Sequence, residues 1–445
     1  MNAARTASLG LALLLSCVSS FATGCAAETD DEDTGVSADA VTDGKIVIKN
    51  NGGPTIAKWG YDVKQDGRSR ALKPALAKEI FVDIGMNLLR VPVRARAAHP
   101  ERGVDNIKAG EYVDDLEAIA NVKAVRPGVD VFASVKLLGK NSFPKWVETG
   151  GGEVDAGAYA TLIENYLAFM KSKGVTIDFL GVDNERKFNE GNITPGKYNK
   201  IASDVKDWCR GNDVKVPDFI AAEDYGPSED TGWLKDLWAS PAKFQHVDHI
   251  GVHIYSKHRD GGYLAAMNTL SNNLHGKKLW DTELHWNDLD QDDEVKWDDL
   301  RRGMLTAMDH FDQGYHALSW WAFQPRSRGT KASFIMSELV SSTVGASLLP
   351  TDDVDGKAPA SGKLNTRAFK NGPKTMTLWV GNFDGKDRKG QRADVSGEDV
   401  AAASYVQWSP QSAIAGKTGN ASLTGKGFTM NYPSNTITRV KVTLK

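Results

Sequence analysis

Cysteine is scarce in this chain of 445 residues, which contains only Cys17, Cys25 and Cys209. Cys17 lies inside an N-terminal apolar segment that we expect to be removed, as argued below. Cys25 would then stand outside any folded domain, so Cys209 has no partner for an internal disulfide. Stability must therefore come from the burial of a hydrophobic core, for which a chain of this length is ample.

Positive charge is not in excess either. The formal net charge is -3 and the sequence pI is about 6.3, whereas a protein that binds nucleic acid needs a concentrated positive field. We therefore expect no nucleic-acid partner. The chain also lacks a Gly-x-Gly-x-x-Gly after its first candidate strand, a P-loop and a Gly-x-Ser-x-Gly elbow. These absences argue against dinucleotide binding, phosphate-loop chemistry and esterase chemistry.

The histidines form no metal-binding motif. Imidazole and carboxylate groups bind zinc, and the candidate ligands are Glu223, Asp224, His246, His249, His253 and His258. His249 and His253 fall on a candidate strand, where a spacing of four residues puts both side chains on one face but too far apart for one ion. No His-Glu-x-x-His occurs, so we predict neither a metal nor any other cofactor.

The N-terminus has the layout of a secretory signal. Arg5 precedes an apolar run over residues 9–18, which is too short to remain in a bilayer as a membrane span. Small residues before Cys25 resemble a bacterial lipobox, although Ala22 stands where leucine is usual. Ordinary secretory cleavage nearby is the alternative. We predict a signal peptide over 1–24, lipidation at Cys25, and an acidic, polar tether over 25–44. This pattern indicates a bacterial protein that is extracellular or anchored by lipid to the outer membrane or cell surface.

Between residues 56 and 349, short apolar runs alternate with longer segments of helical periodicity, which is typical of parallel strands joined by crossover helices. Eight runs are candidate strands: 56–61, 87–93, 129–135, 179–182, 219–222, 250–254, 278–281 and 317–322. Helical spacing is found in the segments 72–84, 112–125, 159–173, 198–210 and 295–313. We therefore predict a (β/α)8 TIM barrel over residues 45–350, in which the carboxyl ends of the strands build the active site.

The composition changes after Leu349. A linker-like segment covers residues 351–362. It is followed by short alternating runs at 375–381, 404–408, 427–432 and 436–444, and residues typical of turns lie between these runs. This pattern predicts a small antiparallel β-sandwich over residues 363–445. Residues 45–50, which include the strand-like run Ile46-Val-Ile48, are a candidate strand of the same sandwich.

Two glutamates stand at the ends of candidate strands. Glu185 follows the run 179–182, and Glu283 follows the run 278–281. Glycosidic bond cleavage with retention needs one carboxylic acid to protonate the leaving oxygen and a second carboxylate to attack the anomeric carbon. An isolated Asn-Glu or Thr-Glu pair occurs by chance in most chains and usually marks a helix cap or a solvated face. The interpretation of Glu185 and Glu283 as a catalytic pair therefore depends on the residues that end the other candidate strands.

The order of these motifs resembles that of clan A glycoside hydrolases, which are retaining (β/α)8 enzymes. The matching residues are Arg90-Val-Pro on the second strand, Asn184-Glu185 after the fourth, His253-Ile-Tyr255 after the sixth, Glu283 at the seventh and Trp321 at the eighth. With its trailing sandwich the chain is most similar to family 30, and also to families 39 and 5 and the agarase-type families. Ser142-Phe-Pro-Lys-Trp146 resembles a Ser-Pro-x-Trp segment of family 30, whereas Asp183 and Arg186 stand where that family has glycine and proline.

The resemblance implies an endo-β-glycanase type of glycosidase that acts on a polysaccharide, as a monomer. Glu185 would be the general acid/base and Glu283 the nucleophile. The implied substrate-binding residues are Arg90, Asn184 (to the sugar 2-hydroxyl), His253, Tyr255 and Trp321 (as a stacking platform). Each has an alternative: Arg90 as a structural ion-pair partner, His253 as a core histidine, and Trp321 as core packing with Trp320 as the platform. For the whole chain, the alternative is a non-catalytic carbohydrate-binding surface lipoprotein.

Several cations fall on loops that a barrel directs to its active face. They are Arg94, Arg96, Arg326, Arg328 and Lys331. Guanidinium groups pair well with carboxylate and sulfate, so these residues favour an acid-decorated glycan as substrate. The alternative is that they bond to carboxylates of the protein or are simply solvated.

Overall fold

The computed structural model describes residues 44–445 except 64–71, 136–142, 151–152, 186–192, 227–232, 257–261, 287–293, 322 and 354–363. Between 234 and 244 it describes only Lys235, Ala239 and Ala242. The predicted signal peptide, Cys25 and nearly all of the tether lie outside the described residues, as do Ser142, Arg186 and most of the predicted linker. Among the residues that the structure describes, no helix has both the length and the apolar character that crossing a bilayer requires.

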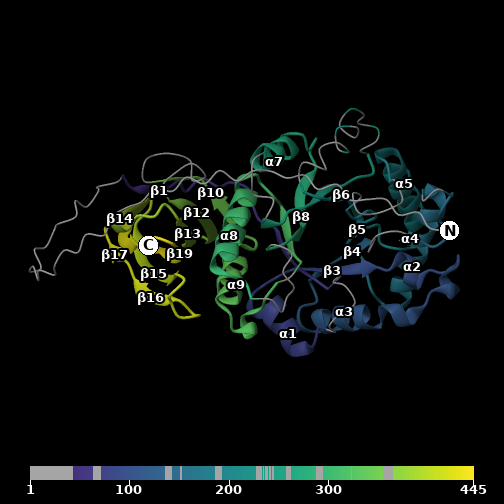
Figure 1. The fold of residues 1–445 in the computed structure, drawn as a ribbon, viewed down its shortest axis with the longest axis horizontal. Helices are drawn as coiled ribbons and strands as arrows, with labels where there is room; N and C mark the ends of the chain where they lie inside the picture. Colours follow the sequence, from purple (N-terminus) through teal and green to yellow (C-terminus); the bar gives the residue numbers. More distant parts are fainter. Residues whose placement is uncertain are drawn as a thin grey trace, which may run out of the picture. The chain divides into compact units, whose positions relative to one another are not determined.

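Eight parallel strands close into a barrel (Figure 1). In chain order they are β2 (Lys58–Asp62), β3 (Leu88–Val93), β4 (Asp130–Val135), β5 (Phe179–Gly181), β6 (Asp218–Tyr225), β7 (His249–His253), β8 (Lys278–Leu284) and β9 (Ala317–Trp320). Each of the eight predicted runs overlaps one of them, and β9 pairs with β2 to close the ring. The predicted fold class, a TIM barrel followed by a β-sandwich, is confirmed.

Helices alternate with the barrel strands. They are α1 (Pro74–Lys78) with the π-helical turn η1 (Glu79–Asp83), α2 (Ala95–Ala98), α3 (Val113–Val125), α4 (Ala156–Ser172), α5 (Pro195–Gly211), α7 (Tyr263–Asn272), α8 (Trp297–Asp312) and α9 (Lys331–Thr343). Short 3-10 turns are η2 (Val104–Asn106), η3 (Ala109–Tyr112) and η7 (Arg326–Arg328). The five predicted helical segments are all present, whereas α2, α7 and α9 were not predicted.

The barrel is filled, not hollow, at its amino end. Leu88, Phe132, Phe179, Ile220, Trp280 and Ala317 project inward from the strands and form a separate buried cluster. The ring of Trp280 packs against Phe179 with centroids 4.7 Å apart. This apolar plug leaves only the carboxyl end of the barrel for polar side chains, which is where TIM barrels carry their active sites.

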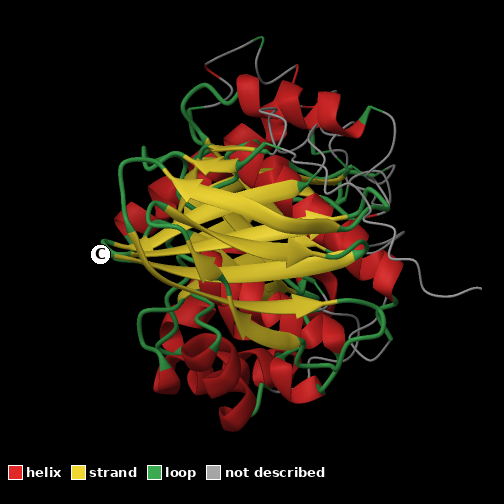
Figure 2. Cartoon of the chain, turned by 90° about the vertical axis from the view of Figure 1, so that its left-hand side faces the viewer, coloured by secondary structure: helices red, strands yellow, loops and turns green. Residues whose placement is uncertain are grey.

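Two sheets form the sandwich, whose strands lie side by side in Figure 2. One sheet has the order β11-β1-β14-β18-β17 and the other β10-β12-β13-β19-β15-β16. The bounds are β1 (Ile46–Ile48), β10 (Ser347–Leu349), β11 (Thr351–Asp352), β12 (Asn365–Gly372), β13 (Thr375–Asn382), β14 (Arg388–Val395), β15 (Val400–Trp408), β16 (Lys417–Asn420), β17 (Ser422–Leu423), β18 (Gly427–Tyr432) and β19 (Thr436–Leu444). Strand β1 pairs in parallel with β14 and antiparallel with β11, so the segment before the barrel completes a sheet made from segments after it.

The six-stranded sheet packs against helices α8 and α9 of the barrel. Trp379 Nε1 donates to Ser342 Oγ at 2.9 Å, and Arg367 Nε donates to Asp312 Oδ1 at 2.7 Å. Phe369 packs edge-on against Phe311 with ring centroids 5.0 Å apart. Because these side chains are largely buried, the sandwich is fixed to the barrel by an apolar interface and not only by the connecting chain.

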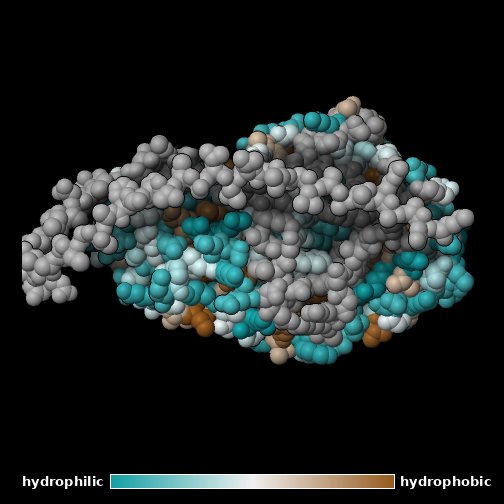
Figure 3. Space-filling view, in the orientation of Figure 1, coloured by the Kyte–Doolittle hydropathy of each residue, from teal (hydrophilic) through white to brown (hydrophobic). Residues whose placement is uncertain are grey.

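The described residues that are coloured in Figure 3 are mostly hydrophilic, with small, separate apolar spots. The exposed large apolar side chains of the described residues are Val82, Val104, Val113, Leu264, Ile414 and Leu423, which come from different elements. Isolated apolar residues of this kind are normal on protein surfaces.

Candidate active site

Arg90 lies at the centre of a buried polar cluster at the carboxyl end of the barrel. Its side chain on β3 is fully buried and donates to groups from five other strands or strand ends. The acceptors are Asp62 Oδ2 (2.7 Å), Glu283 Oε1 (2.5 Å), Glu223 Oε2 (2.8 Å), Ser134 Oγ (3.0 Å) and Asn184 Oδ1 (3.4 Å). Burial alone would lower the pKa of Arg90, but the charges of Glu283, Asp62 and Glu223 raise it overall. The guanidinium therefore stays charged and holds these carboxylates together.

The two glutamates singled out from the sequence face each other. One carboxylate oxygen of Glu185, one of Glu283 and a ring nitrogen of His253 all lie within 4.8 Å of one another. Glu283 is 3% exposed and forms an ion pair with Arg90, whereas Glu185 is partly exposed. The pair thus consists of a fixed, buried carboxylate and a second carboxyl that solvent can reach.

His253 bridges the pair. Its Nδ1 lies 2.9 Å from Glu185 Oε1 and 3.3 Å from Glu283 Oε2. Burial by itself would lower the pKa of the imidazole, but the charge of Glu283, the hydrogen bond with Glu185 and the nearby carboxylate of Glu223 raise it to about 10. At neutral pH the ring is therefore protonated and lies between the two carboxyl groups. A cation in this position opposes the binding of a metal ion by the same three groups.

Tyr255 completes the environment of Glu283. Its hydroxyl donates to Glu283 Oε2 at 3.2 Å, and its ring packs on His285 and Tyr225 with centroids 4.8 and 5.3 Å away. Glu283 therefore accepts from Arg90 at one oxygen and from Tyr255 at the other. Hydrogen bonds and positive charge of this kind favour the ionised form of a carboxylate.

In the sequence, Glu223 was a candidate only as a metal ligand. In the structure it belongs to the buried polar cluster around Arg90. It is fully buried on β6, where it accepts from Arg90 and from Ser134 Oγ at 3.0 Å. The β6–β7 register shifts by one residue between Ala222 and Asp224, and Ala222 and Glu223 have φ values of 70° and 50°. This bulge turns Glu223 into the barrel, and such strain persists where surrounding contacts enforce it.

The neighbouring strand makes room for Glu223. A Cβ atom on Gly181 of β5 would lie 1.5 Å from Glu223 Oε1, so no larger residue fits without moving that carboxylate. The backbone N–H of Glu185, which follows β5 and has a φ of 47°, donates to the carbonyl of Glu223 at 2.8 Å. The bulge on β6 therefore also fixes the start of the segment that carries Glu185.

Asp62 and Ser134, like Glu223, belong to the cluster but were missed by the sequence-based reasoning. Each lies at or near the carboxyl end of a barrel strand, β2 and β4 respectively. That position was the available signal, because side chains at strand ends of a TIM barrel face its active site.

The two tryptophans at the eighth strand are in different environments. Trp320 is fully buried, stacked on Trp59 with centroids 6.3 Å apart and tilted against Trp286 at 4.8 Å. It therefore offers no face to a ligand. Trp321 is only partly buried, and its backbone N–H donates to the carbonyl of Leu284, one residue beyond Glu283, at 3.0 Å.

Three of the loop cations have partners in the protein itself. Arg94 Nε donates to Asp115 at 3.1 Å, and Arg326 pairs with Glu338 at 2.7 Å. Lys331 Nζ donates to the backbone carbonyls of Ser409 and Pro410 at 2.6 and 2.8 Å. These bonds account for the three cations structurally, so they do not support an acid-decorated substrate.

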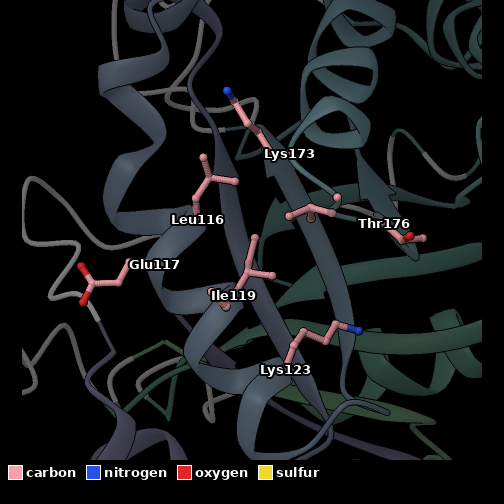
Figure 4. A pocket seen from close by; sticks show the side chains of 9 residues that line it. Leu116, Glu117, Ile119, Lys123, Lys173 and Thr176 are labelled. Atoms are coloured by element: carbon pink, nitrogen blue, oxygen red, sulfur yellow. The ribbon is translucent and has the colours of Figure 1, made fainter.

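A pocket on the outside of the barrel lies away from this cluster (Figure 4). Leu116, Ile119 and Lys123 line it from α3, and Lys173 and Thr176 line it from the segment between α4 and β5. Of the described residues around it, Glu117 is the only acid, and it pairs with Lys73. The pocket contains no carboxylate pair, so we place the candidate chemistry at the barrel mouth.

No family model and no curated relative matches the sequence. The fold, in contrast, is similar to that of solved glycoside hydrolases. A GH30 endoxylanase from Clostridium papyrosolvens C71 has a TM-score of 0.67 at 16% identity, over 90% of this chain and 100% of that chain. A family 30 subfamily 8 xylanase from Clostridium acetobutylicum also has a TM-score of 0.67, at 18% identity, over 90% and 99%. An endo-β-1,6-glucanase gives 0.61 at 13% identity, over 91% and 95%. The resemblance in fold to clan A enzymes, family 30 above all, is thereby confirmed.

Proposed function

We propose that the protein is a retaining glycoside hydrolase that cleaves β-glycosidic bonds of a polysaccharide by double displacement. The observation that carries the proposal is that one carboxyl oxygen of Glu185 lies within 4.8 Å of one carboxyl oxygen of Glu283. Carboxyl groups lie roughly 5 to 5.5 Å apart in retaining glycosidases, against about 6.5 to 9.5 Å in inverting ones, where a water must fit between them. The short separation here favours direct attack by a carboxylate.

In the first step of the proposed reaction, Glu283 attacks the anomeric carbon while Glu185 gives its proton to the leaving oxygen. The products are a glycosyl ester on Glu283 and a shortened glycan chain. In the second step Glu185, now ionised, takes a proton from water, and the water oxygen attacks the anomeric carbon and releases Glu283. The buried, doubly hydrogen-bonded carboxylate suits the nucleophile, and the more exposed carboxyl suits the group that exchanges protons with water.

The surrounding residues fit supporting roles. Arg90 and Tyr255 hold Glu283 ionised and oriented, and His253 places its positive charge between the two carboxyls. Asn184, whose side chain also reaches Arg90, would bond the 2-hydroxyl of the reacting sugar. Trp321 would stack on that sugar, because Trp320 is buried in the core.

The substrate class is proposed from the named activities of the similar structures, which include xylanases and an endo-β-1,6-glucanase. We expect endo-type cleavage of a β-linked polymer by a secreted, lipid-anchored enzyme. A panel of xylan, glucuronoxylan, β-1,3/1,4-glucan, β-1,6-glucan and agarose, with product sizes followed by chromatography, identifies the substrate. Because three loop cations are engaged within the protein, we expect no large preference for glucuronoxylan over neutral xylan. A strong preference that Arg328→Ala abolishes would contradict that expectation.

Replacement of Glu185 by alanine should affect substrates unequally. A natural glycan should lose most of its turnover, because its leaving oxygen needs a proton, whereas a dinitrophenyl glycoside should be spared in the glycosylation step. The measurement compares kcat/KM of the variant and parent on both kinds of substrate. Equal losses on both would show that Glu185 is not the general acid.

A further inference from the structure

Strand β8 contains a bulge next to Glu283. Asp281 pairs with Leu318 and Leu284 pairs with Trp320, so three residue steps on β8 match two on β9. On the other side, Val252 pairs with Asp281 and Tyr255 bridges to His285, so four steps on β8 match three on β7. Strand β8 therefore holds one extra residue relative to both neighbours. An extra residue shifts the alternation of side chains, and here it turns Glu283 toward Arg90.

The side chain of Asp281 satisfies the backbone that the bulge disturbs. Its Oδ1 accepts the N–H of Glu283 at 3.1 Å and the N–H of Ile254, just past β7, at 3.3 Å. Asp281 is fully buried. Without this acceptor, two N–H groups would lose the bonds that now join the ends of β7 and β8, and a buried N–H group without a partner is destabilising.

His310 of α8 holds the other oxygen of Asp281. Its Nε2 lies 2.9 Å from Asp281 Oδ2, and both side chains are fully buried. His310 Nδ1 lies 2.6 Å from the carbonyl oxygen of Thr306, one helical turn earlier. A carbonyl only accepts, so Nδ1 carries a proton, and Nε2 is the ring nitrogen that faces Asp281. Burial raises the pKa of Asp281, while the hydrogen bond and charge of His310 oppose part of that shift.

We propose that Asp281 and His310 are positioning residues that lock the bulge of β8 and thereby fix the Glu283 carboxylate in line for attack on the anomeric carbon. This inference rests on the proposed function. The pair connects the nucleophile to α8 on the outside of the barrel. The helix therefore restrains the position of the Glu283 carboxylate through His310 and Asp281. A displacement of about 1 Å in a reacting group can lower a rate by roughly 10²-fold.

The test compares two substitutions at one position. Asp281→Asn keeps an oxygen acceptor for both backbone N–H groups and offers an amide N–H to His310 Nε2. Asp281→Leu has a similar size and removes the acceptor. We expect Asp281→Leu to lower kcat by about 10²-fold with little change in KM on the best polysaccharide of the panel. Asp281→Asn should stay near the parent.

Hydrogen–deuterium exchange provides a readout that needs no substrate. The amides of Ile254 and Glu283 should exchange faster in Asp281→Leu than in the parent, and at the parental rate in Asp281→Asn. Asp353→Leu is the matched control, because Asp353 is also a buried aspartate that accepts a backbone N–H, from Leu364 at 2.8 Å. It should lower the thermal unfolding temperature without lowering kcat.

The outcomes separate this inference from the proposed function. If Glu283→Ala is inactive but Asp281→Leu keeps the parental kcat and amide exchange, the positioning role is wrong and the proposed function stands. Equal losses of kcat in Asp281→Leu and Asp281→Asn would also overturn the positioning role. If Asp281→Leu does not fold, His310→Leu tests the same lock from the helix side, and an unchanged kcat and amide exchange there contradict the proposal. If no panel substrate is cleaved, the proposed function fails, and the exchange rates alone decide whether Asp281 holds the bulge.

Discussion

Replacement of Glu283 by alanine should abolish hydrolysis of every substrate, whatever its leaving group. Removal of a covalent nucleophile lowers kcat on the order of 10⁴- to 10⁶-fold, because the remaining groups cannot form the covalent glycosyl-enzyme intermediate. An activated aryl glycoside should not rescue this variant, unlike Glu185→Ala, because the attacking group itself is missing. The measurement is kcat on the best polysaccharide of the panel and on a dinitrophenyl glycoside.

Glu117→Ala is the control for this experiment, because Glu117 pairs with Lys73 on the surface of the barrel, away from the polar cluster. It should retain parental activity. Full activity of Glu283→Ala would contradict the assignment of the nucleophile. A parent protein that binds a glycan of the panel but never cleaves it, with an affinity that Glu283→Ala leaves unchanged, would instead favour the non-catalytic surface lipoprotein.

Replacement of Arg90 by leucine should damage both stability and activity. It leaves Asp62, Glu223 and Glu283 buried together without their shared cation. Breaking a buried ion pair from one side costs about 3–5 kcal/mol, because the remaining charge has neither water nor a partner. We expect a loss of this size in the free energy of unfolding, measured by denaturant titration, and a kcat below detection, since Glu283 loses its main orienting bond.

The matched control is Arg326→Leu. Arg326 also pairs with a glutamate, Glu338, but its side chain is 43% exposed, and exposed pairs contribute only about 0–1 kcal/mol. An Arg90→Leu variant as stable as Arg326→Leu would show that the carboxylates do not depend on the guanidinium, and the account of the cluster would have to be abandoned.

The barrel was predictable because its strands are short apolar runs with helical segments between them. Glu185 and Glu283 were predicted from their positions at strand ends together with the resemblance in motif order, since the fold brings all carboxyl ends to one face. Helix α9 was not predicted, and it contains serines at 333, 337, 341 and 342, a residue type with only modest helix propensity. In the structure these side chains bond within the helix, as Ser337 Oγ does to the carbonyl of Ser333 at 2.6 Å, and Thr330 caps its start.

The bulges on β6 and β8 were not predictable. A bulge is defined by the register of a strand against its neighbours, and the local sequence around Glu223 or Asp281 does not contain that register. The roles of Glu223 beneath the site and of Asp281 behind the nucleophile therefore emerge only when the strands are paired. Strand β14 (Arg388–Val395) was not predicted either, because its sequence is mostly polar and only a few apolar side chains point into the sandwich.

The most direct test of the central claim is the stereochemistry of the first product. Proton NMR followed from the moment of mixing enzyme with the best panel polysaccharide distinguishes the two anomers before mutarotation equalises them. Two displacements at one carbon restore the original configuration, so the account predicts that the β-anomer of the new reducing end appears first and the α-anomer only later. The α-anomer as the first product would contradict the assignment of Glu283 as a nucleophile within reach of Glu185.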